Sequence, residues 1–247
     1  MTAAVLWLLL PFFVPLSELW NPAVMLFAAA GVFAPGIGRT LSYLGIERIG
    51  VSRSVPIVNS SPIFASIFAV VFLGEVWVVQ NVFGTLLVIS GVVLLSVAKP
   101  GKGPWRKIDV IFPVLGALSF GISTTMRKAG LGMLNIPLGA AAVTAAAGFL
   151  FSCVLLQAQG GRKALKLSRT SAAWLFSAGI FNTSALLSVF FALSYGQVVV
   201  VEPLISSNPV LTLLMTAIFL RDLEVISLRV VIGALLTVLG TILVVTL

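Results

Sequence analysis

A sequence repeat constrains the fold of this chain more than any other feature. Residues 52–91 return as residues 199–240. Two prolines and a Phe-Leu pair align without a gap: Pro56 with Pro203, Pro62 with Pro209, and Phe72-Leu73 with Phe219-Leu220. After an insertion of two residues, an acid and two glycines align as well: Glu75 with Glu224, Gly84 with Gly233, and Gly91 with Gly240. The ungapped register also extends backwards and places Tyr43 over Phe190. Self-similarity at a separation of about 147–149 residues, within apolar sequence, is typical of transporters built from two related halves.

The composition excludes a soluble fold. Of the 247 residues, 60% are apolar and 9% are charged, whereas a soluble domain averages about 25% charged residues. The chain therefore faces lipid. The absence of histidine removes His-based catalysis and most zinc sites, and we expect no metal and no cofactor. The single Cys153 cannot form an internal disulfide.

The apolar segments predict an all-α polytopic membrane protein with about nine transmembrane helices. A helix needs about 20 apolar residues to cross a bilayer. The predicted spans are 2–17, 21–46, 51–73, 77–98, 108–127, 136–157, 172–195, 197–220 and 225–246. We divide the chain into a first repeat (1–98), a basic linker (99–107) and a second repeat (108–247).

The two inverted repeats are unequal, with four spans in the first and five in the second. By symmetry one helix is expected upstream of Met1. Either the sequence is shortened at its N-terminus or the protein works with one helix fewer. The first span has neither the basic segment nor the cleavage site of a signal peptide.

The net charge of +8 would suggest nucleic acid as a partner in a soluble protein. In a membrane protein, Lys and Arg gather in cytoplasmic loops, so we expect no nucleic acid. On one side, 12 basic residues lie in or near loops: Arg48, Arg53, Lys99, Lys102, Arg106, Lys107, Arg162, Lys163, Lys166, Arg169, Arg221 and Arg229. The opposite side has only Arg127 and Lys128. Loops 99–107 and 158–171 are therefore predicted to be cytoplasmic, with the C-terminus outside.

Two related polar motifs lie in the middle of predicted spans. The first is Asn59-Ser60-Ser61-Pro62 and the second is Ser206-Ser207-Asn208-Pro209. A proline inside a helix removes a backbone donor and kinks the helix, and nearby Ser and Asn side chains can satisfy the freed carbonyls. Interrupted helices of this kind often line transporter sites. A kink held by Ser and Asn without any ligand is an equally good interpretation.

Two charged residues lie within spans. Arg39 is seven residues from the predicted end of its span, and a charge at that depth faces a cavity or a partner or snorkels to the surface. Glu202 can bind a proton, a substrate amine or Arg39, and it can equally be interfacial. As the one acid well within a span, it is the candidate proton carrier.

Other residues have structural interpretations. Glu75 and Glu224, with Asp222, precede a helix and suit its N-terminal dipole. Gly84 with Gly91, and Gly233 with Gly240, are seven residues apart and allow close helix packing, or a contact between subunits. The residues expected to line a substrate cavity are Arg39, Tyr43, Asn59, Ser60, Pro62, Asn182, Glu202, Ser206, Asn208 and Pro209.

The motifs resemble a known family. The run from Asn59 to Glu75, with Gln80, Gly84 and Gly91, resembles the signature end of an EamA domain of the drug/metabolite transporter superfamily. The run from Ser207 to Leu220 resembles the same signature in a second domain. The resemblance implies ten helices in two inverted five-helix repeats, around a central cavity. Here the second, third, fifth, seventh and eighth spans would line it. Well-studied members keep both ends cytoplasmic, unlike the charge pattern of this chain.

The sequence predicts a function on this basis. We expect an inner-membrane secondary carrier that exports a small metabolite, such as an amino acid, by alternating access. Its partners are the lipid bilayer and a small-molecule substrate, and its oligomeric state, homo-oligomer included, stays open. No GxxxxGK[ST] motif occurs, so a gradient would supply the energy. The alternative is a non-transporting membrane protein or an inactive, truncated fragment. An enzyme is disfavoured because no polar catalytic cluster is visible.

Overall fold

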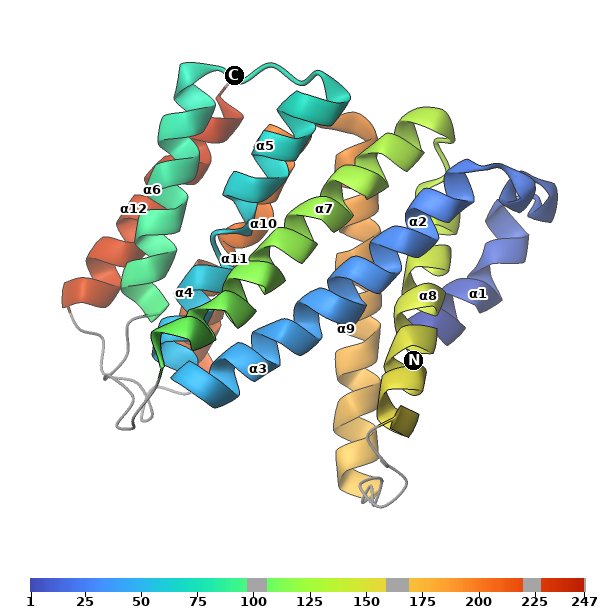
Figure 1. The fold of residues 1–247 in the computed structure, drawn as a ribbon, viewed down its shortest axis with the longest axis horizontal. Helices are drawn as coiled ribbons and strands as arrows, with labels where there is room; N and C mark the ends of the chain where they lie inside the picture. The colour runs from blue at the N-terminus through green and yellow to red at the C-terminus, as the bar shows by residue number, and fades with distance from the viewer. Residues whose placement is uncertain (97–105, 159–168, 220–227, 247) are drawn as a thin grey trace. The chain divides into compact units, whose positions relative to one another are not determined.

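The computed structural model describes residues 1–96, 106–158, 169–219 and 228–246, and within these residues the protein is entirely helical (Figure 1). The helices are α1 (Thr2–Phe13), α2 (Ala23–Gly31), α3 (Arg39–Ile49), α4 (Val51–Val58), α5 (Ser61–Leu73), α6 (Val79–Ser96), α7 (Ile111–Met133), α8 (Pro137–Ala158), α9 (Arg169–Tyr195), α10 (Val198–Ser206), α11 (Asn208–Phe219) and α12 (Leu228–Val245). Short 3-10 turns occur at Leu16–Trp20 and Lys107–Val110. The predicted all-α polytopic fold is confirmed.

Five helices in the described residues are long and apolar enough to cross a membrane: Ala23–Ile49, Arg53–Leu73, Lys107–Met133, Pro137–Ala158 and Trp174–Tyr195. Four apolar helices are shorter: Thr2–Phe13, Val79–Leu95, Val198–Leu211 and Val231–Val245. Each of the nine predicted spans therefore corresponds to helical structure.

One predicted boundary is wrong. The fifth span was expected to end at Arg127, but α7 continues to Met133. Arg127 and Lys128 thus lie within a helix and not in a loop. Both charges have partners in this part of the helix. The Arg127 guanidinium lies 5.4 Å from the ring centroid of Phe190, and the Lys128 ammonium donates hydrogen bonds of 2.8 Å to the carbonyls of Leu193 and Gly196.

A π-helical segment, Val32–Gly38, joins α2 to α3 in one continuous helix, Ala23–Ile49. Pro35 lies inside this segment. Because proline has no N–H, the regular hydrogen bond to the carbonyl four residues earlier cannot form. A local change to π geometry is one way in which a helix accommodates such a gap.

The chain forms two compact units, and each unit takes segments from both sequence repeats. The first unit contains residues 1–37 and 126–196. Its helix α8 packs against α1, α2 and α9. Helix α2 approaches α8 closely, since a Cβ added at Gly148 of α8 would lie only 3.0 Å from the carbonyl oxygen of Gly31 in α2. The hydroxyl of Thr144 donates a 3.0 Å hydrogen bond to the carbonyl of Phe27 in the same contact.

The second unit contains residues 38–125 and 197–247. Helix α6 packs against α12, and α10 packs against α5 and α6. Helices α3 and α4 pack against one another. The first part of α7 approaches α5 at Gly121, where an added Cβ would lie 2.8 Å from the backbone nitrogen of Ala65. This unit contains both proline-containing motifs.

Four glycines lie at the contact between α6 and α12, and they meet crosswise. An added Cβ at Gly84 would lie 2.9 Å from the carbonyl oxygen of Gly240, and one at Gly240 would lie 2.6 Å from that of Gly84. Gly91 and Gly233 face each other in the same way, at 2.5 and 2.9 Å. The first glycine of each helix thus meets the second glycine of the other helix. Related helices packed about a two-fold axis have this pattern, and only glycine permits the backbones to come so close.

The glycine contact predicts a specific stability effect. In a Gly91→Ala variant the new methyl group would meet the hydroxyl of Thr237 and lie 2.5 Å from the carbonyl oxygen of Gly233. Because both belong to a packed helix, we expect a loss of about 1–3 kcal/mol of stability, measured by thermal or SDS-induced unfolding in detergent.

Gly132→Ala provides the matched control. Gly132 also lies in a helix, but a Cβ there would have nothing within 4 Å. Its stability should stay the same or rise slightly, because alanine restricts the unfolded chain. Equal unfolding of the two variants would contradict the packing interpretation.

Candidate functional site

Two helices in the second unit are broken at equivalent positions. Helix α4 ends at Val58 and α5 begins at Ser61, while α10 ends at Ser206 and α11 begins at Asn208. Both breaks fall in the polar motifs that the sequence repeat aligns. Each apolar span therefore consists of two short helices with a polar turn between them.

A proline lies just after each break. Pro62 and Pro209 cannot donate a backbone hydrogen bond to the carbonyl four residues earlier, which favours the end of a helix there, although α4 and α10 themselves continue through Pro56 and Pro203. Pro62 and Pro209 are each the second residue of the helix that follows. A proline is well tolerated in that position because the first-turn N–H groups of a helix have no intrahelical partner. The same residue thus disfavours continuation of one half-helix and suits the start of the next.

A serine hydroxyl stabilises each break in the same way. Ser60 donates a 2.6 Å hydrogen bond to the carbonyl of Ile57, and Ser207 donates a 2.7 Å bond to the carbonyl of Leu204. The backbone angles agree as well, with φ −81° and ψ 2° at Ser60, and φ −76° and ψ −4° at Ser207. Two segments far apart in the chain therefore have one local structure, which includes its side-chain bond.

The second unit holds nine of the ten residues expected to line a cavity, all except Asn182. Around the breaks, Asn208 is exposed, Pro62 is buried, and Asn59, Ser60, Ser206 and Pro209 are partly exposed. The polar groups at both breaks are thus partly open to the surroundings of the chain.

Arg39 and Tyr43 lie on α3. They are four residues apart, and so are on one side of the helix. Arg39 is exposed and Tyr43 is 63% exposed. Because α3 ends at Ile49 and not at residue 46, Arg39 lies ten residues from the end of the helix. The end of the helix therefore lies three residues further from Arg39 than the sequence predicted.

Glu202 lies in α10 and is only 6% exposed. Its depth was uncertain from the sequence, and the structure places it among buried residues of the same helix, Val199, Val201 and Pro203. The buried position distinguishes it from an acid at an exposed span end.

Asn182 lies in the first unit, on an exposed part of α9. Its side-chain nitrogen donates a 2.9 Å hydrogen bond to the hydroxyl of Thr2. The described contact of Asn182 therefore joins α9 to α1.

A comparison with known protein families shows to which family the chain belongs. A model described as the EamA-like transporter family matches residues 1–97 and 107–246. The chain belongs to the EamA-like transporter family. It is therefore a membrane transporter with several membrane-spanning helices, and members of the family are generally not enzymes. The resemblance to the EamA family is confirmed.

Comparison with solved structures finds 17 matching chains. One of these, described simply as the crystal structure of a protein, has a TM-score of 0.65 and 15% sequence identity. The alignment covers 99% of this chain and 95% of that chain. At this identity the likeness shows the EamA-like fold alone. No curated protein matches the chain.

Glu75 of this EamA-like chain binds a different helix from the one that the sequence suggested. Its acid was expected to suit the dipole of the helix that directly follows, α6. Instead its two carboxylate oxygens accept hydrogen bonds of 2.9 and 3.1 Å from the backbone N–H groups of Val198 and Val199. These are the first residues of α10, in the other repeat. Its repeat counterpart Glu224 and the neighbouring Asp222 lie outside the described residues.

Sequence reasoning missed a polar stretch on α7. Ser119, Ser123, Thr124, Thr125 and Arg127 are all buried. Ser119, Thr124 and Thr125 donate to carbonyls one turn earlier in their own helix, at 2.8, 3.2 and 3.0 Å. This bonding lets hydroxyl groups lie within an apolar helix. The signal in the sequence was a cluster of hydroxyl residues at helical spacing.

A second set of missed residues lies in the second unit. Ser66 on α5, and Asn81 and Thr85 on α6, each bury an oxygen that has no hydrogen-bond partner in the described part of the chain. Asn81 and Thr85 are one turn apart on the same side of α6. Buried polar atoms without a protein partner are commonly satisfied by water, so we expect a hydrated patch on this side of α6.

The Glu75 bonds predict a local effect. A Glu75→Ala variant removes both acceptors from the first turn of α10, and replacing an N-terminal capping side chain costs about 0.5–2 kcal/mol. We expect faster amide hydrogen exchange at the start of α10, measured by mass spectrometry. Glu75→Gln should show an intermediate effect, because its amide keeps one acceptor oxygen and loses the charge.

Glu47→Ala serves as the control for Glu75, because Glu47 is an exposed acid of α3 in the same unit. It should leave exchange in α10 unchanged. Unaltered exchange at Val198 and Val199 in Glu75→Ala would show that the carboxylate does not stabilise α10.

Proposed function

We propose that this transporter is a secondary carrier that exports a small polar or amphipathic metabolite, such as an amino acid, by alternating access. The observation that carries the proposal is the pair of broken helices. Carriers bind their cargo where interrupted helices leave backbone groups available near the middle of the membrane. Here two such breaks share their proline, serine bond and backbone angles.

The breaks also provide a place at which the helices can move. A continuous helix resists bending because every turn is held by hydrogen bonds, whereas a proline break lacks one of them. We propose that the two repeats rock about the region of Pro62 and Pro209. Asn59, Ser60, Ser206 and Asn208 would then contact the cargo. They offer hydroxyl and amide groups that can both donate and accept hydrogen bonds.

Glu202 is the proposed proton carrier. Its carboxylate is buried within α10, the helix whose C-terminal end forms one of the breaks. Protonation of a buried acid changes its charge in a low-dielectric environment, so it can bias one conformation over another. A proton gradient would then drive transport through this residue.

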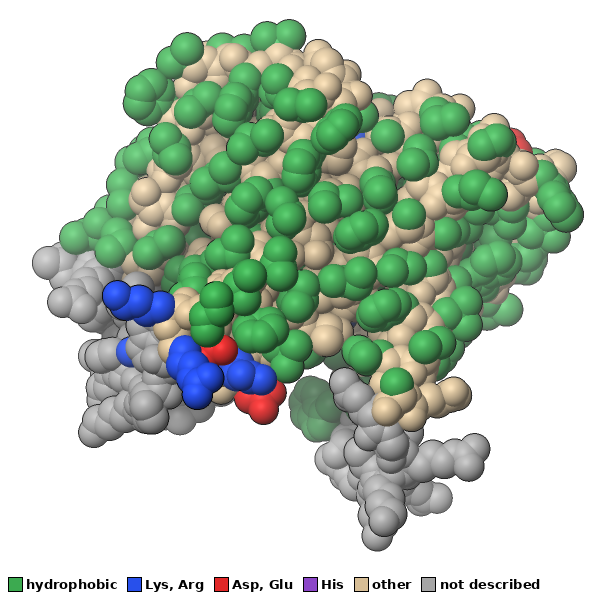
Figure 2. All heavy atoms as spheres, viewed as in Figure 1, with side chains coloured by type: hydrophobic (Ala, Val, Ile, Leu, Met, Phe, Trp, Pro, Cys, Tyr) green, Lys and Arg blue, Asp and Glu red, His purple; other side chains and the backbone are tan. Residues whose placement is uncertain are grey.

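Charge supports a membrane orientation. Figure 2 shows hydrophobic side chains over most of the visible face, with Lys, Arg, Asp and Glu side chains gathered near the C-terminal end of α3. There Arg48 lies 3.6 Å from Asp109, close to the basic residues Arg106 and Lys107. We propose that this end is cytoplasmic and that the membrane is the inner membrane. Most residues of the basic loops 99–107 and 158–171 lie outside the described residues.

Transport by the purified chain in liposomes tests the carrier proposal. The chain is reconstituted, and efflux of labelled amino acids and small metabolites is measured. Pro62→Ala and Pro209→Ala should each lower the rate about tenfold or more, because small displacements of binding groups have effects of that order.

Pro137→Ala is the matched control for the two proline variants. Pro137 is the first residue of α8, where proline interrupts no hydrogen bond, so its replacement should leave transport unchanged. Equal rates in all three variants would show that the breaks have no part in transport.

The role of Glu202 has its own test. Glu202→Gln should abolish uptake driven by a proton gradient and retain exchange of labelled for unlabelled substrate, because the uncharged amide cannot take part in proton release. Glu47→Gln, in the same unit, should change neither rate. Proton-driven uptake at the normal rate in Glu202→Gln would remove this residue from the coupling mechanism.

A further inference from the structure

Arg39 lies well inside an apolar helix. The continuous helix Ala23–Ile49 has 27 residues, and Arg39 is three residues from its middle. If the helix is centred in the bilayer, Arg39 lies roughly 10 Å below the nearer edge of the hydrocarbon core. A charge at this depth is costly, and in membrane proteins such a residue usually faces a cavity or a polar partner.

The described residues supply no such partner. No hydrogen bond or ion pair joins Arg39 to any residue in the described part of the chain. Asp109 lies beside Arg48, and Glu75 binds the first turn of α10. Arg39 nevertheless contributes a full positive charge at this position.

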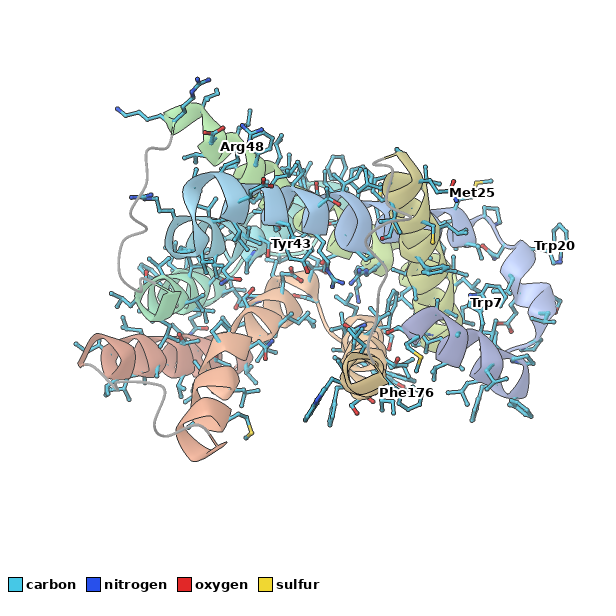
Figure 3. The ribbon with its side chains drawn as sticks, turned by 90° about the horizontal axis from the view of Figure 1, so that it is seen from below. Trp7, Trp20, Met25, Tyr43, Arg48 and Phe176 are labelled. Atoms are coloured by element: carbon cyan, nitrogen blue, oxygen red, sulfur yellow. The ribbon has the colours of Figure 1, made fainter. Side chains whose placement is uncertain are left out.

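Tyr43 lies one turn beyond Arg39, and its hydroxyl likewise has no hydrogen bond within the described residues. Figure 3 shows Tyr43 and Arg48 on different sides of α3. The Arg39–Tyr43 side is thus distinct from the side that carries Arg48 and its ion pair with Asp109. One helix side within an apolar span offers a cation and a hydroxyl donor together.

The charge of the site selects the class of ligand. Arg39 is the one cation away from the helix ends among the described residues of the second unit. One guanidinium balances one negative charge, which suits a single carboxylate. A phosphate or a dicarboxylate would bring a second charge without a second cation.

We propose that Arg39 binds the carboxylate of the transported substrate and that Tyr43 donates a further hydrogen bond to it. The substrate class is therefore small molecules with a single carboxylate, free α-amino acids included. Arginine is suited to this role because its planar fork of N–H groups matches both oxygens of a carboxylate. The inference rests on the proposed carrier function and adds the charge requirement to it.

The test compares three pools of labelled compounds in liposomes that contain the full chain. The first holds monocarboxylates and α-amino acids, the second holds the primary amides of the same compounds, and the third holds simple amines. We expect transport of the first pool only. Arg39→Gln should lower that rate about 10- to 100-fold, because a charged hydrogen-bond donor is lost. Arg39→Lys should restore part of it, and Tyr43→Phe should have a smaller effect.

Arg48→Gln is the matched control. It removes the same charge from the same helix, but at an exposed position whose ion pair contributes little. It should leave the rate for the first pool unchanged. Transport of amides as fast as acids, or normal acid transport in Arg39→Gln, would overturn the carboxylate site and leave the carrier function intact. Failure of all three pools to move would overturn both proposals.

Discussion

The exclusion of water from the bilayer is the constraint on which this structure depends. Without water, a backbone carbonyl that loses its helical partner must find another one within the protein. Pro62 and Pro209 each leave the carbonyl four residues earlier without its helical donor. A serine hydroxyl bonds the carbonyl next to it in both copies, that of Ile57 and that of Leu204. The breaks are consequently ordered turns with defined angles.

Two contacts join the sequence repeats within the second unit. Glycines let α6 and α12 approach until their backbones touch, and the carboxylate of Glu75 completes the first turn of α10. The second contact connects the copies directly, because Glu75 follows α5 and α10 belongs to the other repeat. A shift of α10 would therefore have to move or release this carboxylate.

Much of the fold could be predicted from the sequence, because long apolar runs and the aligned prolines depend on local chemistry. The helical breaks at Asn59–Ser60 and at Ser207 agree with the aligned Pro62 and Pro209, whereas the equally well aligned Pro56 and Pro203 lie inside α4 and α10 without a break. The end of α7 did not follow, because Arg127 and Lys128 are polar in the sequence and become acceptable in a helix only through Phe190 and the end of α9. The partner of Glu75 was also beyond prediction, because a carboxylate can bind any nearby helix end and the sequence does not say which one is near.

The π-helical segment Val32–Gly38 records a difference between the two copies. Before it, Ala30-Gly31-Val32-Phe33 matches Ala178-Gly179-Ile180-Phe181 at a separation of 148 positions, whereas Tyr43 matches Phe190 at 147. The first copy thus has one extra residue between these points, where its helix widens. A π turn holds one more residue than an α turn, so it accommodates an insertion without turning the rest of the helix. Just beyond it, position 39 is arginine in one copy and its counterpart, Leu186, is apolar in the other. The two halves have a common origin, but their aligned residues at this position are no longer chemically equivalent.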